Sequence, residues 1–118
     1  MENFLPTAQD LRIAFAEAML ATKKVFTATA NLQNAKDLLE KNILTSTANG
    51  LITGTNEVTR KASAFTQMPH LFEAVDQAEV NLKEAGIQLK EAENVLALYR
   101  DLLRLGEIVT SEGYTRFS

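Results

Sequence analysis

The chain has 118 residues, of which 46% are hydrophobic, 12 are basic and 15 are acidic, giving a net charge of −3. This length supports one helical domain over residues 1–118, and the hydrophobic share excludes an intrinsically disordered chain. The absence of cysteine excludes disulfides, thiolate metal sites and a cysteine nucleophile. Because the net charge repels phosphate, no nucleic-acid partner is expected.

The first predicted element is a long helix over about residues 8–47. Thr7 stands three residues before Asp10, which approximates a capping box at a helix start. Asn49 and Gly50 tolerate the left-handed backbone conformation that ends helices. The Met-Glu-Asn-Phe-Leu-Pro start lacks the basic residues and apolar run of a signal peptide. We therefore expect a soluble protein that is not exported by the general route, and the sequence indicates no particular compartment.

A connection over about residues 48–69 follows, and we expect it to contain a short helix at about 57–67. Asn56 is a good N-cap, Val58, Ala62 and Phe65 form a small apolar stripe, and Pro69 ends the element. No charge occurs between Lys41 and Glu57. The favoured interpretation folds this uncharged tip, residues 42–56, against the short helix. Contact of the tip with a partner protein or a membrane surface is the alternative.

The second long helix is predicted over about residues 70–105, with Gly106 as its stop and residues 106–118 as a tail. Gly86 lies inside this helix, where glycine costs about 1 kcal/mol relative to alanine. It indicates either a close approach of another backbone or a tolerated surface glycine. No segment contains the run of about 20 apolar residues that spans a bilayer.

Both long helices carry apolar residues at alternating steps of three and four, with alanine at every second position over most of the pattern. Such a seven-residue period is typical of helices that wind around each other, and alanine allows the two backbones to approach closely. The predicted fold is therefore all-α: a long antiparallel helical hairpin with an alanine-rich coiled-coil seam. We expect the seam to consist of Leu11, Ala14, Ala18, Ala21, Val25, Ala28, Leu32, Ala35 and Leu39 from the first helix and Val75, Ala78, Leu82, Ala85, Leu89, Ala92, Leu96, Tyr99 and Leu103 from the second.

The apolar surface exceeds what two helices can bury against each other. Surplus residues surround the first helix near its start and form a second band on the other helix, Val80, Ile87, Val95, Leu98, Leu102 and Leu105. The short helix and the tail could cover part of this surface, or a second copy of the chain could. The candidate self-association residues are Phe4, Leu5, Ile13, Phe15, Met19, Leu102, Leu105, Ile108 and Phe117.

No residue pattern indicates catalysis, a cofactor or a metal. His70 is the single histidine and is interpreted as a surface or capping residue, and the glutamates of the second helix resemble an ordinary solvated face. The expected function is a non-enzymatic structural subunit that self-associates, as in a virion, an injection apparatus or a filament. The alternative is a small helical adaptor or chaperone that binds one partner protein.

Overall fold

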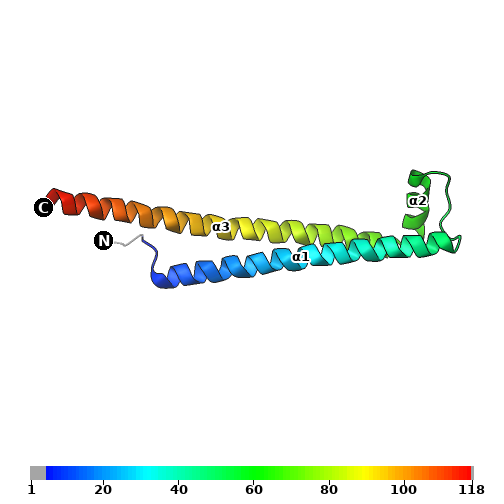
Figure 1. The fold of residues 1–118 in the computed structure, drawn as a ribbon, viewed down its shortest axis with the longest axis horizontal. Coiled ribbons are helices and arrows are strands. Elements are labelled where there is room, and N and C mark those ends of the chain that lie inside the picture. The colour runs from blue at the N-terminus through cyan, green and yellow to red at the C-terminus, as the bar shows by residue number, and fades with distance from the viewer. Residues whose placement is uncertain (1–4, 118) are drawn as a thin grey trace. The chain divides into compact units, whose positions relative to one another are not determined.

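The computed structural model describes the backbone of residues 5–117 and the side chains of residues 5–107. It contains three helices, α1 (Ala8–Ala48), α2 (Glu57–Gln67) and α3 (Pro69–Phe117), and no strand within the described residues (Figure 1). α1 packs antiparallel to α3, and α2 lies in the connection between them. The predicted fold class, an all-α helical hairpin with a short third helix, is confirmed.

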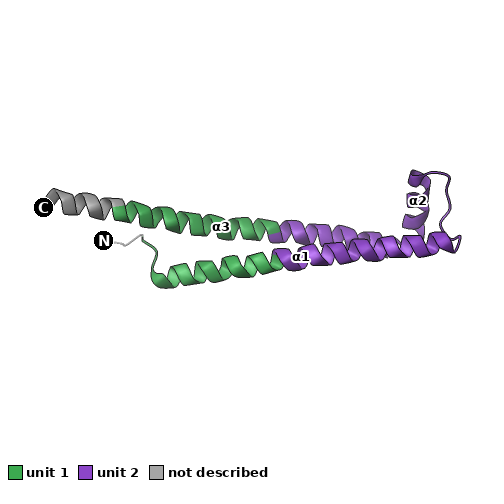
Figure 2. Cartoon of the chain, viewed as in Figure 1, with its two compact units in different colours: residues 1–24, 86–118 green, residues 25–85 purple. Residues whose placement is uncertain are grey.

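The chain divides into two compact units, and both boundaries fall inside the long helices (Figure 2). Unit 1 comprises residues 1–24 and 86–118, so it pairs the first part of α1 with the later part of α3. Unit 2 comprises residues 25–85 and holds the rest of α1, all of α2 and the start of α3. Each unit therefore has its own segment of the helix pair.

Local signals set both ends of α1. The Thr7 amide donates to Asp10 Oδ2 at 2.9 Å, and the Asp10 amide donates to Thr7 Oγ1 at 3.1 Å, so the predicted capping box forms. At the other end, Gly50 has a φ of +73°. The Gly50 amide bonds to the Thr47 carbonyl at 3.0 Å and the Leu51 amide to the Ser46 carbonyl at 2.9 Å. This pair of bonds is a Schellman motif, and it confirms the predicted stop at Asn49–Gly50.

The short helix α2 forms at the predicted residues, but its predicted apolar stripe is not the face that packs. Asn56 caps the helix by accepting from the Thr59 amide at 2.9 Å. Ala64 and Met68 are the buried residues here, with Ile52 of the preceding loop, while Val58 and Phe65 are exposed. Ala64 is 0% exposed. Its small side chain allows α2 to lie close to the rest of unit 2, which a larger residue would prevent.

The loop between α1 and α2 folds back on α2. Ile52 enters the buried cluster, the Thr53 amide donates to Ser63 Oγ at 3.2 Å, and Gln67 Nε2 donates to the Leu51 carbonyl. The predicted folding of the uncharged tip against the short helix is therefore confirmed for these residues. Gly54 is required at its position, because its φ is +141° and a Cβ would come within 2.8 Å of the Arg60 amide nitrogen.

The predicted stop of the second long helix at Gly106 is wrong, since α3 continues to Phe117. A glycine that ends a helix adopts a positive φ, and within the described residues only Gly50 and Gly54 do so. Gly106 has a packing role instead. A Cβ on Gly106 would lie 2.8 Å from Leu5 Cδ2, so the missing side chain leaves room for Leu5 against the helix. The predicted tail, residues 106–118, is thus helical through Phe117.

Gly86 is a tolerated surface glycine, because nothing lies within 4 Å of the position that its Cβ would take. We expect Gly86→Ala to raise the free energy of unfolding by about 0.5–1 kcal/mol, since alanine restricts the unfolded chain and favours the helix. Chemical denaturation followed by circular dichroism measures the change. A loss of stability would show that a backbone does approach this position.

Candidate interaction surfaces

All the predicted seam residues lie on the inner side of the helix pair. Each of them is buried or half-buried, while most of their neighbours in the sequence are exposed. The alanines are the most deeply buried: Ala14 is 3% exposed, and Ala21, Ala28, Ala78 and Ala85 are buried as well. The remaining seam residues, the other three alanines included, are half-buried. Unit 1 contains Leu11, Ala14, Ala18, Ala21, Leu89, Ala92, Leu96, Tyr99 and Leu103, and unit 2 contains Val25, Ala28, Leu32, Ala35, Leu39, Val75, Ala78, Leu82 and Ala85.

Two grooves flank the seam in unit 1, one on each side. The larger, groove 1, has a volume of about 830 Å³. Its lining on α3 includes Lys90, Ala97 and Arg104, each one residue after a seam leucine. Groove 2 has a volume of about 310 Å³ and is lined on α3 by Gln88, Glu91 and Val95, each one residue before a seam residue. Because successive residues of a helix point about 100° apart, these two sets lie on opposite sides of the seam.

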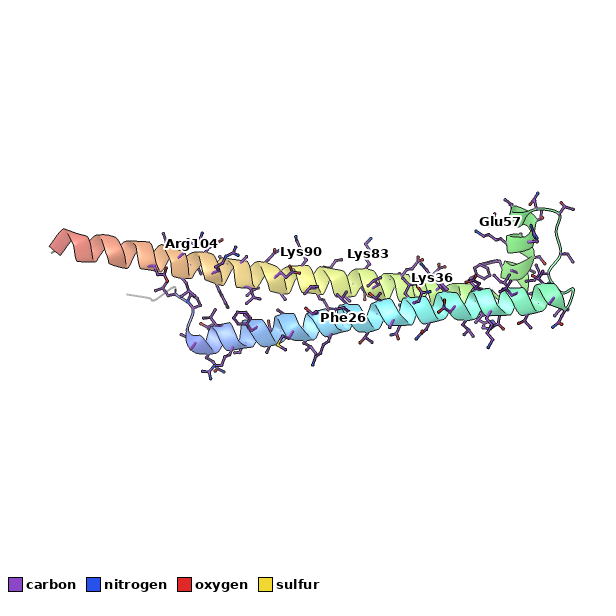
Figure 3. All side chains as sticks on the ribbon, viewed as in Figure 1. Phe26, Lys36, Glu57, Lys83, Lys90 and Arg104 are labelled. Atoms are coloured by element: carbon purple, nitrogen blue, oxygen red, sulfur yellow. The ribbon has the colours of Figure 1, made fainter. Side chains whose placement is uncertain are left out.

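Groove 1 is a mixed surface. Phe15 of α1 forms an exposed apolar wall, and α3 contributes positive charges at Lys90, Arg100 and Arg104 together with negative charges at Glu93 and Glu107. Figure 3 shows Lys90 and Arg104 among the side chains that project from α3. Arg100 Nε also lies 3.6 Å from Asp101 Oδ1, with both side chains largely exposed. Alternating charges of this kind do not favour one class of small ligand.

The groove 2 side of unit 1 carries an apolar surface that the described residues leave largely exposed. On α3, Val95, Leu98, Leu102 and Leu105 follow at steps of three, four and three, and the first three each stand one residue before a seam residue. Leu102 is half-buried, and the other members of the surface are between 37% and 57% exposed. Leu20, which lines groove 2, and Ile13, seven residues earlier, share this side of α1. We call this surface the lateral apolar face: Ile13, Leu20, Val95, Leu98, Leu102 and Leu105.

The predicted self-association residues fall into three groups. Leu5, Ile13, Phe15, Met19 and Leu105 are exposed, and Leu102 is half-buried. The side chains of Phe4, Ile108 and Phe117 lie outside the described residues. Phe15 borders groove 1, whereas Ile13, Leu102 and Leu105 belong to the lateral apolar face, so the exposed residues do not form one surface.

The self-association residues predicted from the sequence do not include Leu20, Val95 and Leu98. The second apolar band on α3 contained Val95 and Leu98, but it also contained Val80 and Ile87. Ile87 stands two residues before Leu89 of the seam, which places it on the outer side of α3, away from α1. The sequence signal that distinguishes the two sides is the spacing. Val95, Leu98, Leu102 and Leu105 follow one another at steps of three, four and three and therefore share one side of α3, whereas Ile87 does not belong to this series.

Unit 2 has a separate exposed apolar surface on α2. Val58 and Phe65 are exposed on that helix, as is Leu51 in the loop before it. The Phe65 ring contacts the Phe72 ring edge-on, with centroids 5.4 Å apart. This contact holds one side of Phe65 and leaves the rest of its ring open to solvent.

The polar side chains of the described part are all half-buried or exposed. None of the described polar or charged side chains is buried, and no group of three or more His, Asp or Glu side chains among them could hold a metal ion. His70 is exposed in the first turn of α3. Asp37 Oδ1 accepts a hydrogen bond from Gln33 Nε2 at 2.8 Å. In the part of the chain that the structure describes, no helix combines the length and apolarity needed to cross a membrane.

Fold and surfaces together define an all-α helical-hairpin protein with exposed apolar faces. No protein-family model, no curated protein and no solved structure matches the chain.

Proposed function

We propose that this protein is a non-enzymatic structural subunit that associates with copies of itself through apolar helix faces and its termini. A virion, an injection apparatus or a filament is the kind of assembly that such a subunit serves. The proposal rests on one observation above the others: the described residues of unit 1 leave most of the lateral apolar face exposed. Contiguous exposed apolar surface on a folded chain is typical of a surface that another protein covers.

The seam supports this proposal because it accounts for the buried alanines of both long helices without using the lateral apolar face. Larger apolar residues and alanines share the positions where α1 meets α3, and the five buried seam residues are all alanines. The exposed leucines stand on a different side of the same helix. A helix that is apolar on two sides is typically covered on both.

Molar mass in solution tests the proposal. We expect light scattering and sedimentation velocity of the full chain, from about 1 to 500 μM, to give masses above the 13.0 kDa of one chain. The mass should rise with concentration, because a self-association equilibrium follows mass action. A constant mass of one chain over the whole range would contradict the proposal.

The exposed residues of α2 support a second candidate, a small adaptor or chaperone that binds one other protein. Val58 and Phe65 are exposed on α2, which the buried residues Ala64 and Met68 hold against the rest of unit 2. For this function we expect a chain that is monomeric or dimeric when pure and that recovers one stoichiometric partner. Phe65→Ser should abolish that recovery and leave the mass of the pure protein unchanged.

A further inference from the structure

We infer that the lateral apolar face of unit 1 packs against the same face of a second copy about a two-fold axis parallel to the helices. In this arrangement, α1 of each copy lies against α3 of the other, and the four helix segments form a bundle in which all neighbours are antiparallel. The inference rests on the proposed self-association and adds the face, the partner and the orientation.

The spacing of the lateral stripe indicates a helix as its partner. Val95, Leu98 and Leu102 repeat the steps of three and four that place the seam residues of the same helix against α1. An uncharged stripe of this spacing is what one helix presents to another in a bundle. α3 thus carries two such stripes in unit 1, and its own α1 covers only the seam.

The size of the face suits a second copy. Six aliphatic side chains, most of them about half exposed, hold on the order of 500 Å² of apolar surface. A stable dimer buries about 800 Å² per partner, of which the centre is apolar and the rim is polar. Glu17, Lys24, Gln88 and Glu91, which line groove 2, supply polar rim beside this centre.

The charges of the rim select the orientation. Lys24 of α1 and Glu91 of α3 line the same groove, so they lie at about the same level along the helices. A two-fold axis parallel to the helices preserves this level and places Lys24 of one copy opposite Glu91 of the other. A perpendicular axis through the middle of the face, near residue 99, would instead place α1 against α1 and α3 against α3. Lys24 of one copy would then no longer face Glu91 of the other, and the complementary charges favour the parallel axis.

Leu98→Glu tests the face, and Ile87→Glu is its matched control. Both residues are on α3 in unit 1, with exposed fractions of 54% and 51%, but Ile87 is on the outer side of the helix. We expect Leu98→Glu to raise the dissociation constant of the smallest assembly at least tenfold and Ile87→Glu to change it less than threefold. Circular dichroism should show the same helix content for both variants. Equal effects of the two variants would overturn the inference.

Spin labels test the orientation. The chain contains no cysteine, so Gln88→Cys gives one unique attachment point at one end of the face. With the parallel axis, the two labels lie level and their separation reflects the bundle width, on the order of 20 Å. With a perpendicular axis near residue 99, they would be about 33 Å apart along the helices alone. Electron–electron resonance distances separate these outcomes, and the longer one would overturn the inference.

Charge-reversal variants distinguish a Lys24–Glu91 pair between two copies from the same pair within one chain. Lys24→Glu and Glu91→Lys should each weaken the homodimer, because both variants place like charges across the interface. A mixture of the two variants should recover the assembly as a heterodimer, since positions 24 and 91 then carry opposite charges across both halves of the interface. No recovery on mixing would overturn the proposed register.

Failure of the proposed function and failure of this inference give different results. A single-chain mass for the native protein would contradict the proposed function itself. An assembly whose dissociation constant does not change in Leu98→Glu would contradict only this inference.

Discussion

Ala28→Leu and Ala85→Leu are each expected to lower the free energy of unfolding by about 1–3 kcal/mol. Both alanines are buried in unit 2, one on α1 and the other on α3. A leucine at either position adds three heavy atoms where the helices leave room for one methyl group. The helices must then separate or the side chain must adopt a strained rotamer, and either change weakens the packing along the seam.

Ala30→Leu is the matched control, because Ala30 is an exposed residue on the same helix two positions after Ala28. Alanine and leucine are both good helix formers, so this control is expected to change stability by less than about 0.5 kcal/mol. Denaturant unfolding followed by circular dichroism measures all three variants. If Ala28→Leu is as stable as Ala30→Leu, the two long helices do not meet through a close alanine contact.

Ile52→Ala is expected to lower the free energy of unfolding by about 2–4 kcal/mol, because it leaves a cavity in the buried cluster of unit 2. Ile52 is 6% exposed and packs with Ala64 and Met68. Leu51, the preceding residue, is 57% exposed, so Leu51→Ala removes a similar volume from the surface. We expect that control to cost less than about 0.5 kcal/mol.

Amide hydrogen exchange locates the effect of the Ile52 substitution. The amides of α2 should exchange faster in Ile52→Ala than in Leu51→Ala, while those of Ala14 and Ala21 in unit 1 should change little. This result is expected because the cluster of Ile52, Ala64 and Met68 is the buried contact that holds α2 to the rest of unit 2. Equal protection in the two variants would show that α2 is held by other contacts.

The helices and three of their ends were predictable from sequence because local chemistry determines them. The Thr7–Asp10 capping box, the Asn56 cap and the Asn49–Gly50 stop use hydrogen bonds between residues at most five positions apart. Such bonds form wherever the helix forms, whatever packs around it. The seam was also accessible, since a sustained step of three and four indicates which side of a long helix faces a partner.

Only the tertiary structure decided the roles of residues whose neighbours are distant in the sequence. Gly106 resembles a helix stop, yet it accommodates Leu5, a residue 101 positions earlier. The apolar stripe of α2 predicts a buried face, yet Ala64 is buried because it allows the closest approach. Likewise, the surplus apolar residues were visible in the sequence, but their division between groove 1 and the lateral apolar face depends on how α1 and α3 pack. Periodicity defines a side of one helix, whereas a surface is defined by two helices together.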